Sequence, residues 1–284
     1  MLREKLENKE FVITMEVDPP RGADPWPVYE KIKQVAPLLT AANIADCPTA
    51  KLRMSPIALA HLIQRQLDLE TIFHLTCRDR NILGLQAELL GAWAMGVKNI
   101  LTVTGDHPQL GDHPEASAVY EVNSGGLAEI AAALNAGHDY CGHPLEDATQ
   151  LFIGAVANPA LKDLAIEKSK VEKKIASGVQ FFQTQPIYSL EQLHRFQEEV
   201  QPSVPVIYGI MPLKGVKQAL YLNNKVPGVH VPKNMIDLLE KFGEEAVTEQ
   251  LTEMILTMKK EVDGVHLFPM GKYDRIAGLL EAIQ

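Results

Sequence analysis

Short apolar segments alternate with longer helical segments along the whole 284-residue chain. The short segments are mostly apolar and only a few residues long, which is typical of buried strands. Strands that alternate with helices indicate parallel βα units rather than hairpins. The expected strands are 11–17, 43–45, 71–75, 99–103, 151–156, 181–184, 204–210 and 264–268.

The segments between these strands have apolar residues at helical spacing. One of them opens with Ser55-Pro56, an N-cap residue followed by Pro at the first helical position. An extra pair of helices is expected within 233–262, before the last strand. The other expected helices are 27–39, 55–66, 81–95, 126–135, 160–176, 190–200, 217–224 and 273–283.

Eight strand–helix units predict a single (β/α)8 TIM barrel over residues 1–284, with extra helices before strand eight. The rival fold is an open doubly wound sheet, which usually carries a glycine-rich phosphate loop after its first strand. The sequence contains no GxGxxG or Walker-type motif. The barrel is therefore the favoured fold.

Charge and cysteine usage restrict the partners and the compartment. The chain has 36 acidic and 27 basic residues and a net charge of −9, which disfavours nucleic acid and anionic membranes as partners. The charged start, MLREKLENKE, is unlike a signal peptide, and no apolar run reaches the roughly 18 residues of a membrane span. Cys47, Cys77 and Cys141 form no CxxC pair, which suits a reducing cytosol. We expect a cytoplasmic protein.

In a barrel of this kind, functional residues lie where strands end and the following loops begin. Ionisable and amide side chains are concentrated at these points, whereas the strand interiors are mostly apolar. We therefore expect the site at the carboxyl ends of the strands. The residues at these ends are Glu16, Asp46, His74, Asp106, Asn158, Gln185 and Met211.

Two carboxylates are the leading catalytic candidates. Glu16 lies inside an apolar strand, where partial desolvation would raise its pKa and suit it to general-acid chemistry near neutral pH. A carboxylate at a strand end can equally cap backbone amides or pair with a lysine. Asp106 follows Gly105, which permits a tight turn that directs the carboxylate over the barrel mouth. Gly-Asp is also an ordinary turn sequence.

Basic and metal-ligating side chains form two further clusters. Lysines at 168, 170, 173 and 174 crowd one expected helix, and Lys170 and Lys174 share a face that suits a diphosphate. A solvated helix face that also carries glutamates fits the same residues. The segment HDYCGH at 138–143 has residues of metal-ligating type, but short loops of this kind are usually only loops. No metal site is expected, and a single histidine such as His74 is more often structural than catalytic.

Taken in order, several short motifs resemble the methylenetetrahydrofolate reductase family over nearly the whole chain. Each motif stands at an expected strand end. The motifs are Met15-Glu16-Val17-Asp18-Pro19-Pro20, His74-Leu75-Thr76-Cys77, Gly105-Asp106, Asn158-Pro159, Thr184-Gln185-Pro186 and Gly209-Ile210-Met211-Pro212.

The resemblance implies a barrel that binds FAD and reduces 5,10-methylenetetrahydrofolate to 5-methyltetrahydrofolate, with NADH or NADPH as electron donor. Glu16 matches the general acid that protonates N10 of the folate, and Asp106 matches an aspartate near the flavin and the pterin. The positions that match flavin-binding residues are Asp46, His74, Thr76, Ala157, Asn158, Lys173 and Lys174. The positions that match substrate-binding residues are Glu16, Asp106, Gln185, Gln218 and Leu222.

Some positions depart from the better-known members of this family. Thr104 stands where they carry an arginine, Leu222 where they carry a stacking aromatic residue, and Asn158 where they carry a tyrosine. The insertion at 137–144 is also foreign to them. In these features the chain is more similar to reductases of anaerobes and to the reductase modules that accompany a homocysteine methyltransferase domain. Direct oxidation of NADH or NADPH is then less secure than flavin binding.

Two alternatives stay open on sequence grounds. A barrel methyltransferase that handles a folate would need a thiol-activating zinc site or a corrinoid partner, and the cysteines do not provide the zinc site. The second alternative is a folate-binding subunit that receives electrons from a partner protein. Leu222 supports it, because this position lacks the stacking aromatic residue of the better-known members. For either reductase we expect methylenetetrahydrofolate, with or without a polyglutamate tail, as the ligand. Barrels of this kind also often form homo-oligomers.

Overall fold

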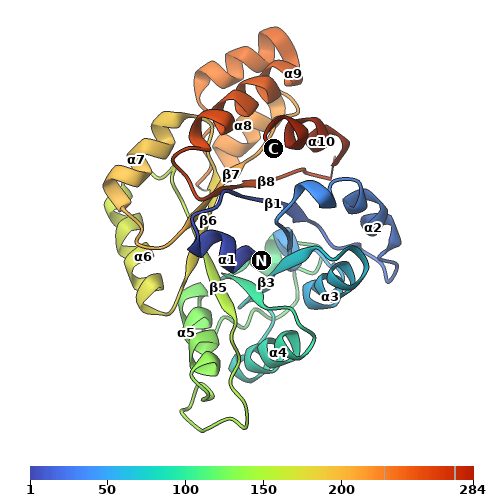
Figure 1. Ribbon diagram of the computed structural model, residues 1–284, viewed down its shortest axis with the longest axis vertical. Coiled ribbons are helices and arrows are strands. Elements are labelled where there is room, and N and C mark those ends of the chain that lie inside the picture. Colours follow the sequence, from blue (N-terminus) through green and yellow to red (C-terminus); the bar gives the residue numbers. More distant parts are fainter. Residues whose placement is uncertain (227, 272) are drawn as a thin grey trace.

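Eight parallel strands form a closed barrel in the computed structural model, which describes residues 1–226, 228–271 and 273–284 (Figure 1). Each strand pairs with the next along the chain, and the last pairs with the first, so that Met15 lies opposite both Ala42 and Leu267. The predicted (β/α)8 barrel is thus confirmed. The strands are β1 (Val12–Val17), β2 (Ala41–Ile44), β3 (Glu70–Thr76), β4 (Asn99–Val103), β5 (Phe152–Ala157), β6 (Phe181–Pro186), β7 (Val206–Ile210) and β8 (Gly264–Leu267).

Helices surround the barrel on all sides, as Figure 1 shows. The helix α9 contains a break at Gly243, where φ is 83° and ψ is −171°. The expected extra pair of helices before the last strand is therefore present. The outer helices are α2 (Trp26–Lys33), α3 (Pro56–Leu67), α4 (Ile82–Ala94), α5 (Ser124–Asn135), α6 (Leu164–Ala176), α7 (Leu190–Val200), α8 (Val216–Lys225), α9 (Lys233–Met258) and α10 (Tyr273–Ala282).

Helix boundaries follow local capping and proline positions more closely than the periodicity indicated. The helix expected at 27–39 ends at Lys33, and a short 3-10 turn at Ala36–Leu38 follows, because Pro37 cannot continue an α-helix. The helix expected from 160 starts at Leu164, where the Asp163 side chain accepts a hydrogen bond from the amide of Ala165. Ser55 caps α3 as expected.

An N-terminal helix, α1 (Leu2–Glu7), was not expected from the sequence. Its Leu2 and Leu6 are almost completely buried against residues from the amino ends of the strands. The amide of Leu2 also donates a hydrogen bond to Glu70 Oε2 over 2.6 Å. Figure 1 shows α1 lying across the barrel, which it closes at the amino ends of the strands. The strand residues in this cluster are Val12, Ala41, Ile72, Leu101, Phe152, Phe181 and Ile207.

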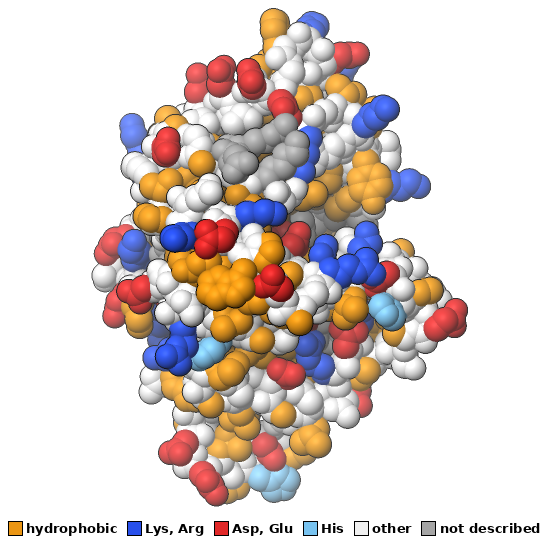
Figure 2. Space-filling view, turned by 90° about the vertical axis from the view of Figure 1, so that its right-hand side faces the viewer, with side chains coloured by type: hydrophobic (Ala, Val, Ile, Leu, Met, Phe, Trp, Pro, Cys, Tyr) orange, Lys and Arg blue, Asp and Glu red, His pale blue; other side chains and the backbone are white. Residues whose placement is uncertain are grey.

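The outer surface carries charges of both signs. Figure 2 shows acidic, basic and apolar side chains interspersed on the face that lies at the right of Figure 1. Among the helices of the described residues, none combines the length and the apolar character that crossing a membrane requires.

Truncating the closing helix at its buried leucine should destabilise the barrel. We expect Leu6→Ala to lower the free energy of unfolding by about 2–5 kcal/mol, because Leu6 is only 2% exposed and its loss leaves a cavity. The measurement is urea denaturation followed by circular dichroism. Leu83→Ala is the matched control, since Leu83 is 75% exposed and its truncation should change stability by less than about 0.5 kcal/mol. Equal effects of both substitutions would show that α1 is not part of the core.

Candidate functional site

A layer of polar side chains fills the barrel interior above the apolar cluster that contacts α1. The amides of Asn43 and Gln183 bond to each other in both directions, over 2.6 and 3.1 Å. Thr14 Oγ1 lies 2.9 Å from His266 Nδ1, and Asn43 Nδ2 lies 3.1 Å from His74 Nε2. Residues from five different strands therefore form one hydrogen-bonded network. Such a network satisfies polar groups that would otherwise be costly to bury.

Both histidines of this layer are neutral near physiological pH. Burial lowers the pKa of His74 to about 4 and that of His266 to about 3. Since the amide of Asn43 can only donate through Nδ2, His74 Nε2 accepts this bond and the ring proton lies on Nδ1. The floor of the barrel mouth is thus polar but uncharged.

Glu16 lies near the carboxyl end of β1, on the wall of the barrel mouth. Burial, with a smaller contribution from the negative charge of Asp18, raises the pKa of Glu16 to about 8. The expectation that desolvation raises this pKa is confirmed. Because the pKa lies above neutral pH, the carboxyl group holds its proton there and can donate it to a bound molecule.

A cavity of about 620 Å³ opens at the carboxyl ends of the strands, and it brings most of the predicted site residues together. They come from β1, β3, β5 and β6, from the loops that follow β2, β4 and β5, and from α6. The predicted residues on its wall are Glu16, Asp46, His74, Thr76, Asp106, Ala157, Asn158, Lys174 and Gln185.

Three of the residues assigned to cofactor or substrate are absent from the wall of this cavity, and so is Met211, which follows β7 and packs into the hydrophobic core. Lys173 is exposed on α6, and Gln218 Oε1 accepts a hydrogen bond from the amide of Lys214 over 2.7 Å at the start of α8. Leu222 is 5% exposed and packs into the hydrophobic core. Their assignment to cofactor or substrate stays a prediction from the family resemblance alone.

Asp46 is fixed by a dense set of donors. Its Oδ2 accepts hydrogen bonds from the amide and the hydroxyl of Thr76, each over 2.9 Å. The same oxygen pairs with Arg80 over 2.8 Å. Asp46 is almost completely buried, so this ion pair holds the end of β2 rigidly against the end of β3.

Asp106 stands in a turn that requires glycine before it. Gly105 has a φ of 92°, and a Cβ atom there would lie 3.0 Å from Thr76 Cβ. Tyr120 donates its hydroxyl to the Gly105 carbonyl over 3.1 Å, which holds the turn in place. Asp106 itself is exposed, and its Oδ2 accepts a hydrogen bond from the amide of Thr49 over 3.0 Å.

Two lysines of α6 lie at one side of the cavity. Lys174 is half-buried, and its Nζ donates to the carbonyl of Val156 over 2.6 Å. Burial lowers the pKa of this lysine. Lys170 is exposed and lies 4.0 Å from Glu167, whose other oxygen accepts a hydrogen bond from the amide of Asn158. The lysine pair therefore gives this side of an acidic protein a local positive charge.

Sequence reasoning missed several polar residues of the mouth. Asn43, Gln183 and His266 are buried polar residues inside strands, the same signal that identified Glu16. Arg78 also lines the cavity, is 3% exposed and pairs with Asp79 over 2.8 Å. Its position in the loop after β3 could have marked it in advance.

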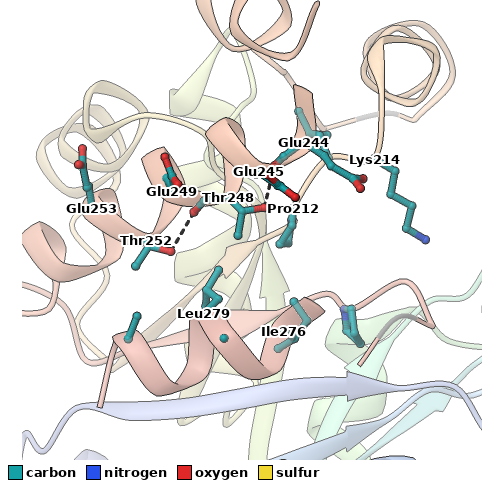
Figure 3. Close-up of a pocket in the computed structure, with 14 residues that line it drawn as sticks. Pro212, Lys214, Glu244, Glu245, Thr248, Glu249, Thr252, Glu253, Ile276 and Leu279 are labelled. Atoms are coloured by element: carbon teal, nitrogen blue, oxygen red, sulfur yellow. Dashed lines mark hydrogen bonds between the residues drawn. The ribbon is translucent and has the colours of Figure 1, made fainter. Parts of the chain in front are cut away.

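A second cavity of similar size, about 640 Å³, lies away from the strand ends that carry these residues (Figure 3). It is formed by the second part of α9, by α10 and by the loops after β7 and β8. Glutamates such as Glu245, Glu249 and Glu253 line it beside apolar residues of α10. None of the predicted site residues reaches this groove, so the mouth of the barrel is the better candidate for chemistry.

The sequence model of a family described as methylenetetrahydrofolate reductase matches residues 1–284. A relative from Schizosaccharomyces pombe, methylenetetrahydrofolate reductase 1, is 23% identical over 239 residues, which are 79% of this chain and 37% of the relative. The 5,10-methylenetetrahydrofolate reductase of Salmonella typhimurium is 22% identical over 276 residues, 92% of this chain and 86% of that protein. This chain thus spans little more than a third of the fission-yeast protein.

A solved structure shares the fold over the full length of the chain. It is a Clostridium thermocellum protein described as binding two copies of 5-methyl-5,6,7,8-tetrahydrofolic acid, with a TM-score of 0.67 and 14% identity. The alignment covers 100% of this chain and 98% of that one. At this identity the likeness concerns the barrel architecture alone.

The raised pKa of Glu16 should appear in the pH dependence of stability. In the folded state the pKa is about 8, against an ordinary value of 4.5, so the folded protein binds this proton more tightly. The stability contributed is full below pH 4.5 and is lost as the pH rises through 8. We expect the free energy of unfolding of the Glu16→Gln variant to rise relative to that of the parent protein as the pH increases, by on the order of 2–4 kcal/mol between pH 5 and pH 9. Urea denaturation at both pH values measures this, and the exposed Glu115→Gln should show no such trend.

Proposed function

Because the chain belongs to the methylenetetrahydrofolate reductase family, we propose that it reduces 5,10-methylenetetrahydrofolate to 5-methyltetrahydrofolate with FAD as its cofactor. The observation that carries this proposal is a protonated carboxyl group, that of Glu16, on the wall of a large cavity at the barrel mouth. The proposed reaction begins with a proton transfer to the substrate, and the raised pKa of Glu16 and its position on the cavity wall support it as the donor.

In the proposed reaction Glu16 donates its proton to N10 of the folate. The bond between N10 and the bridging methylene carbon then breaks, and the lone pair of N5 forms a double bond to that carbon. The product is a 5-iminium cation, and Glu16 is left as a carboxylate. Burial keeps the proton on Glu16 until the folate binds, and the iminium cation that then forms stabilises the resulting carboxylate.

Asp106 supplies a negative charge at the same mouth. As an exposed carboxylate that lines the cavity after β4, it is suited to favour the positive charge that develops on the pterin. Gln185, near the end of β6, also lines the cavity. Its side-chain amide offers both a donor and an acceptor to a pterin or a glutamyl group. These three residues form our proposed substrate site.

The remaining wall of the cavity fits a flavin nucleotide. Lys170 and Lys174 offer positive charge to a diphosphate, while Asp46, Thr76 and Asn158 offer fixed polar groups along the adjoining strands. The small side chain of Ala157 leaves room for a ring or ribose to approach the strand ends. When bound, reduced FAD supplies the hydride that the methylene carbon accepts. The roles of Lys173, Gln218 and Leu222 rest on the resemblance only.

The source of the electrons is a second question, and one observation favours a protein donor. Leu222 is buried in the core at the position where the better-known members carry an aromatic residue. It therefore offers no exposed ring on which a nicotinamide could stack. We infer as an alternative that a redox partner, rather than NADH or NADPH, reduces the flavin.

An anaerobic absorbance titration separates these possibilities. Purified protein that carries a flavin spectrum, bleached by NADH or NADPH and restored by methylenetetrahydrofolate, would establish the self-sufficient reductase. Bleaching by dithionite alone, followed by reoxidation with the folate, would establish the partner-fed form. A protein that binds no FAD, even when FAD is added, would refute the cofactor assignment.

Removing the acid should abolish only the folate half of the reaction. We expect Glu16→Gln to retain flavin and to accept electrons from dithionite, but to reduce methylenetetrahydrofolate about 10²–10⁴-fold more slowly. In the parent protein the same step should slow as the pH rises through about 8, where Glu16 loses its proton. Stopped-flow reoxidation of the reduced flavin measures both effects. Unchanged rates in the variant would exclude Glu16 as the acid.

The lysine pair provides an independent check on the cofactor. Lys174→Ala should weaken FAD binding by roughly tenfold, because it removes a cation close to the proposed diphosphate position. Lys168→Ala is the matched control on the same helix, since Lys168 is not on the cavity wall. Fluorescence titration of the apoprotein with FAD measures both affinities. Equal affinities for the parent and the Lys174 variant would assign this lysine to a structural role.

A further inference from the structure

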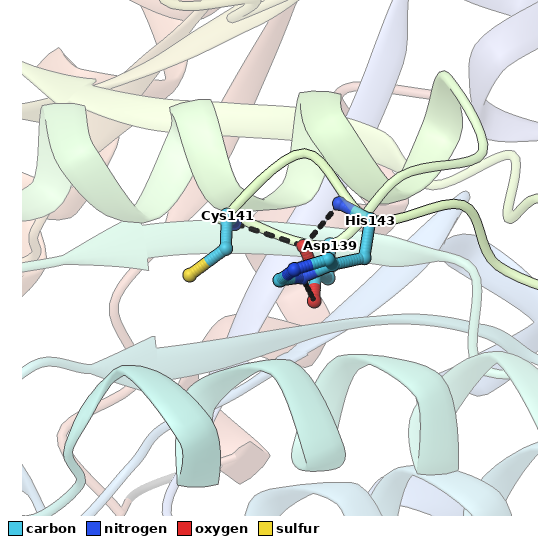
Figure 4. Close-up of side chains that lie close together, drawn as sticks. All are labelled: Asp139, Cys141 and His143. Atoms are coloured by element: carbon cyan, nitrogen blue, oxygen red, sulfur yellow. Dashed lines mark hydrogen bonds and ion pairs between the residues drawn. The ribbon is translucent and has the colours of Figure 1, made fainter.

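The loop between α5 and β5 brings together three side chains of metal-ligating type that the barrel mouth does not use. They are Asp139, Cys141 and His143, and one possible ligand atom from each lies within 4.8 Å of the other two. Figure 4 shows the three side chains on the same side of the loop. All three kinds of group, a carboxylate, a thiol and an imidazole, are ordinary ligands of zinc.

The loop is held in this shape by its own hydrogen bonds. Asp139 Oδ1 accepts from the backbone amides of Cys141 and His143, over 2.9 and 2.8 Å. The amide of Asp139 donates to the carbonyl of His143 over 2.9 Å, and Gly142 makes the turn with a φ of 87°. The amide of Tyr140 donates to Gln86 Oε1 over 2.7 Å, which ties the loop to α4. The ligand atoms are therefore positioned before any ion arrives, which lowers the ordering cost of binding.

The spacing within the cluster suits a tetrahedral ion. Asp139 Oδ2 and His143 Nδ1 lie 2.9 Å apart and share one proton. Two oxygen or nitrogen ligands of zinc, with bonds of about 2.0–2.1 Å, lie roughly 3.3 Å apart in a tetrahedron. An ion that replaces the shared proton therefore needs this pair to open by only a few tenths of an ångström. The exposed Cys141 can then turn its sulfur toward the same point.

We propose that Asp139, Cys141 and His143 form a site for a zinc-class divalent cation, with water as the fourth ligand. The mixture of one thiolate, one imidazole and one carboxylate favours Zn²⁺ over Mg²⁺ or Ca²⁺, which prefer oxygen ligands only. Binding releases the thiol proton of Cys141, and the proton on His143 Nδ1 moves to Nε2 if the ring is neutral. No electron transfer is involved.

The position of the site separates it from the chemistry of the mouth. The loop precedes β5 and so belongs to the end of the barrel where strands begin, whereas the cavity lies where strands end. None of the three ligands lines that cavity. The ion would therefore stabilise the loop between α5 and β5 and would not contact the reacting atoms. It is distinct from a thiol-activating zinc of a methyltransferase, which must face the substrate.

Cobalt binding to the full chain tests the proposal directly. Co²⁺ is added to metal-free protein kept reduced by a non-thiol reductant, and the thiolate charge-transfer absorption is followed to its end point. We expect one ion per chain, displaced by Zn²⁺. Cys141→Ser should remove the thiolate band, and His143→Ala should weaken binding at least about tenfold. His138→Ala is the matched control, since this exposed histidine lies on the same loop outside the cluster.

Each outcome of the cobalt titration either supports or overturns the proposed site. A thiolate band that is lost in the Cys141 variant, weakened in the His143 variant and kept in the His138 variant supports the proposed ligands. Absence of the band in the parent protein overturns the site. A band that survives Cys141→Ser assigns the sulfur to Cys47 or Cys77 and overturns the site as well. All these variants change exposed side chains, and circular dichroism of each confirms that the barrel is folded.

Discussion

The hydrogen-bonded seam between β1 and β8 is the constraint on which the rest of the molecule depends. It closes the sheet, and because all the strands are parallel, their carboxyl ends meet at one rim. Glu16, Asp106 and Gln185 are far apart in the sequence but line a single cavity for this reason. The seam also brings Thr14 of β1 within 2.9 Å of His266 of β8, which links the two ends of the chain inside the barrel.

Burial shifts the pKa of Glu16 and the pKa values of the two histidines in opposite directions, but in each case it favours the uncharged form. It raises the pKa of Glu16 and lowers the pKa of His74 and of His266, because the charged form is penalised in each case. A protonated histidine in this layer would stabilise the carboxylate and pull the proton off Glu16. The neutral amides and imidazoles of the network avoid this. The uncharged floor therefore adds no positive charge that would oppose the effect of burial on the pKa of Glu16.

Much of this arrangement was predictable, and the failures have identifiable physical causes. The strand at Asn99–Val103 and the helix at Leu190–Val200 match the expected ranges, because their apolar spacing is clear. Glu16 stood out as a charge within an apolar strand. The helix α1 escaped notice because its Leu2 and Leu6 lie among charged residues, and only the closed barrel shows what they cover.

Other features depend on geometry that no local pattern contains. The meeting of Gln183 with Asn43 and His266 requires the register of distant strands. The loop cluster at Asp139 depends on a turn whose direction is set by Gly142. The family resemblance placed Leu222 near the ligands, but the packing of α8 against the core decides that this side chain faces inward.

The closing helix α1 has a consequence for the timing of the proposed reaction. With apolar side chains sealing the barrel at one end, whatever reaches the polar floor must enter and leave through the opposite rim. An electron donor and a folate that need the same face of one cofactor would compete for that entrance. The two must then take turns, and excess of either should slow the other. For the proposed reaction, an entrance shared by both substrates favours a ping-pong order, in which the electron donor leaves before the folate binds.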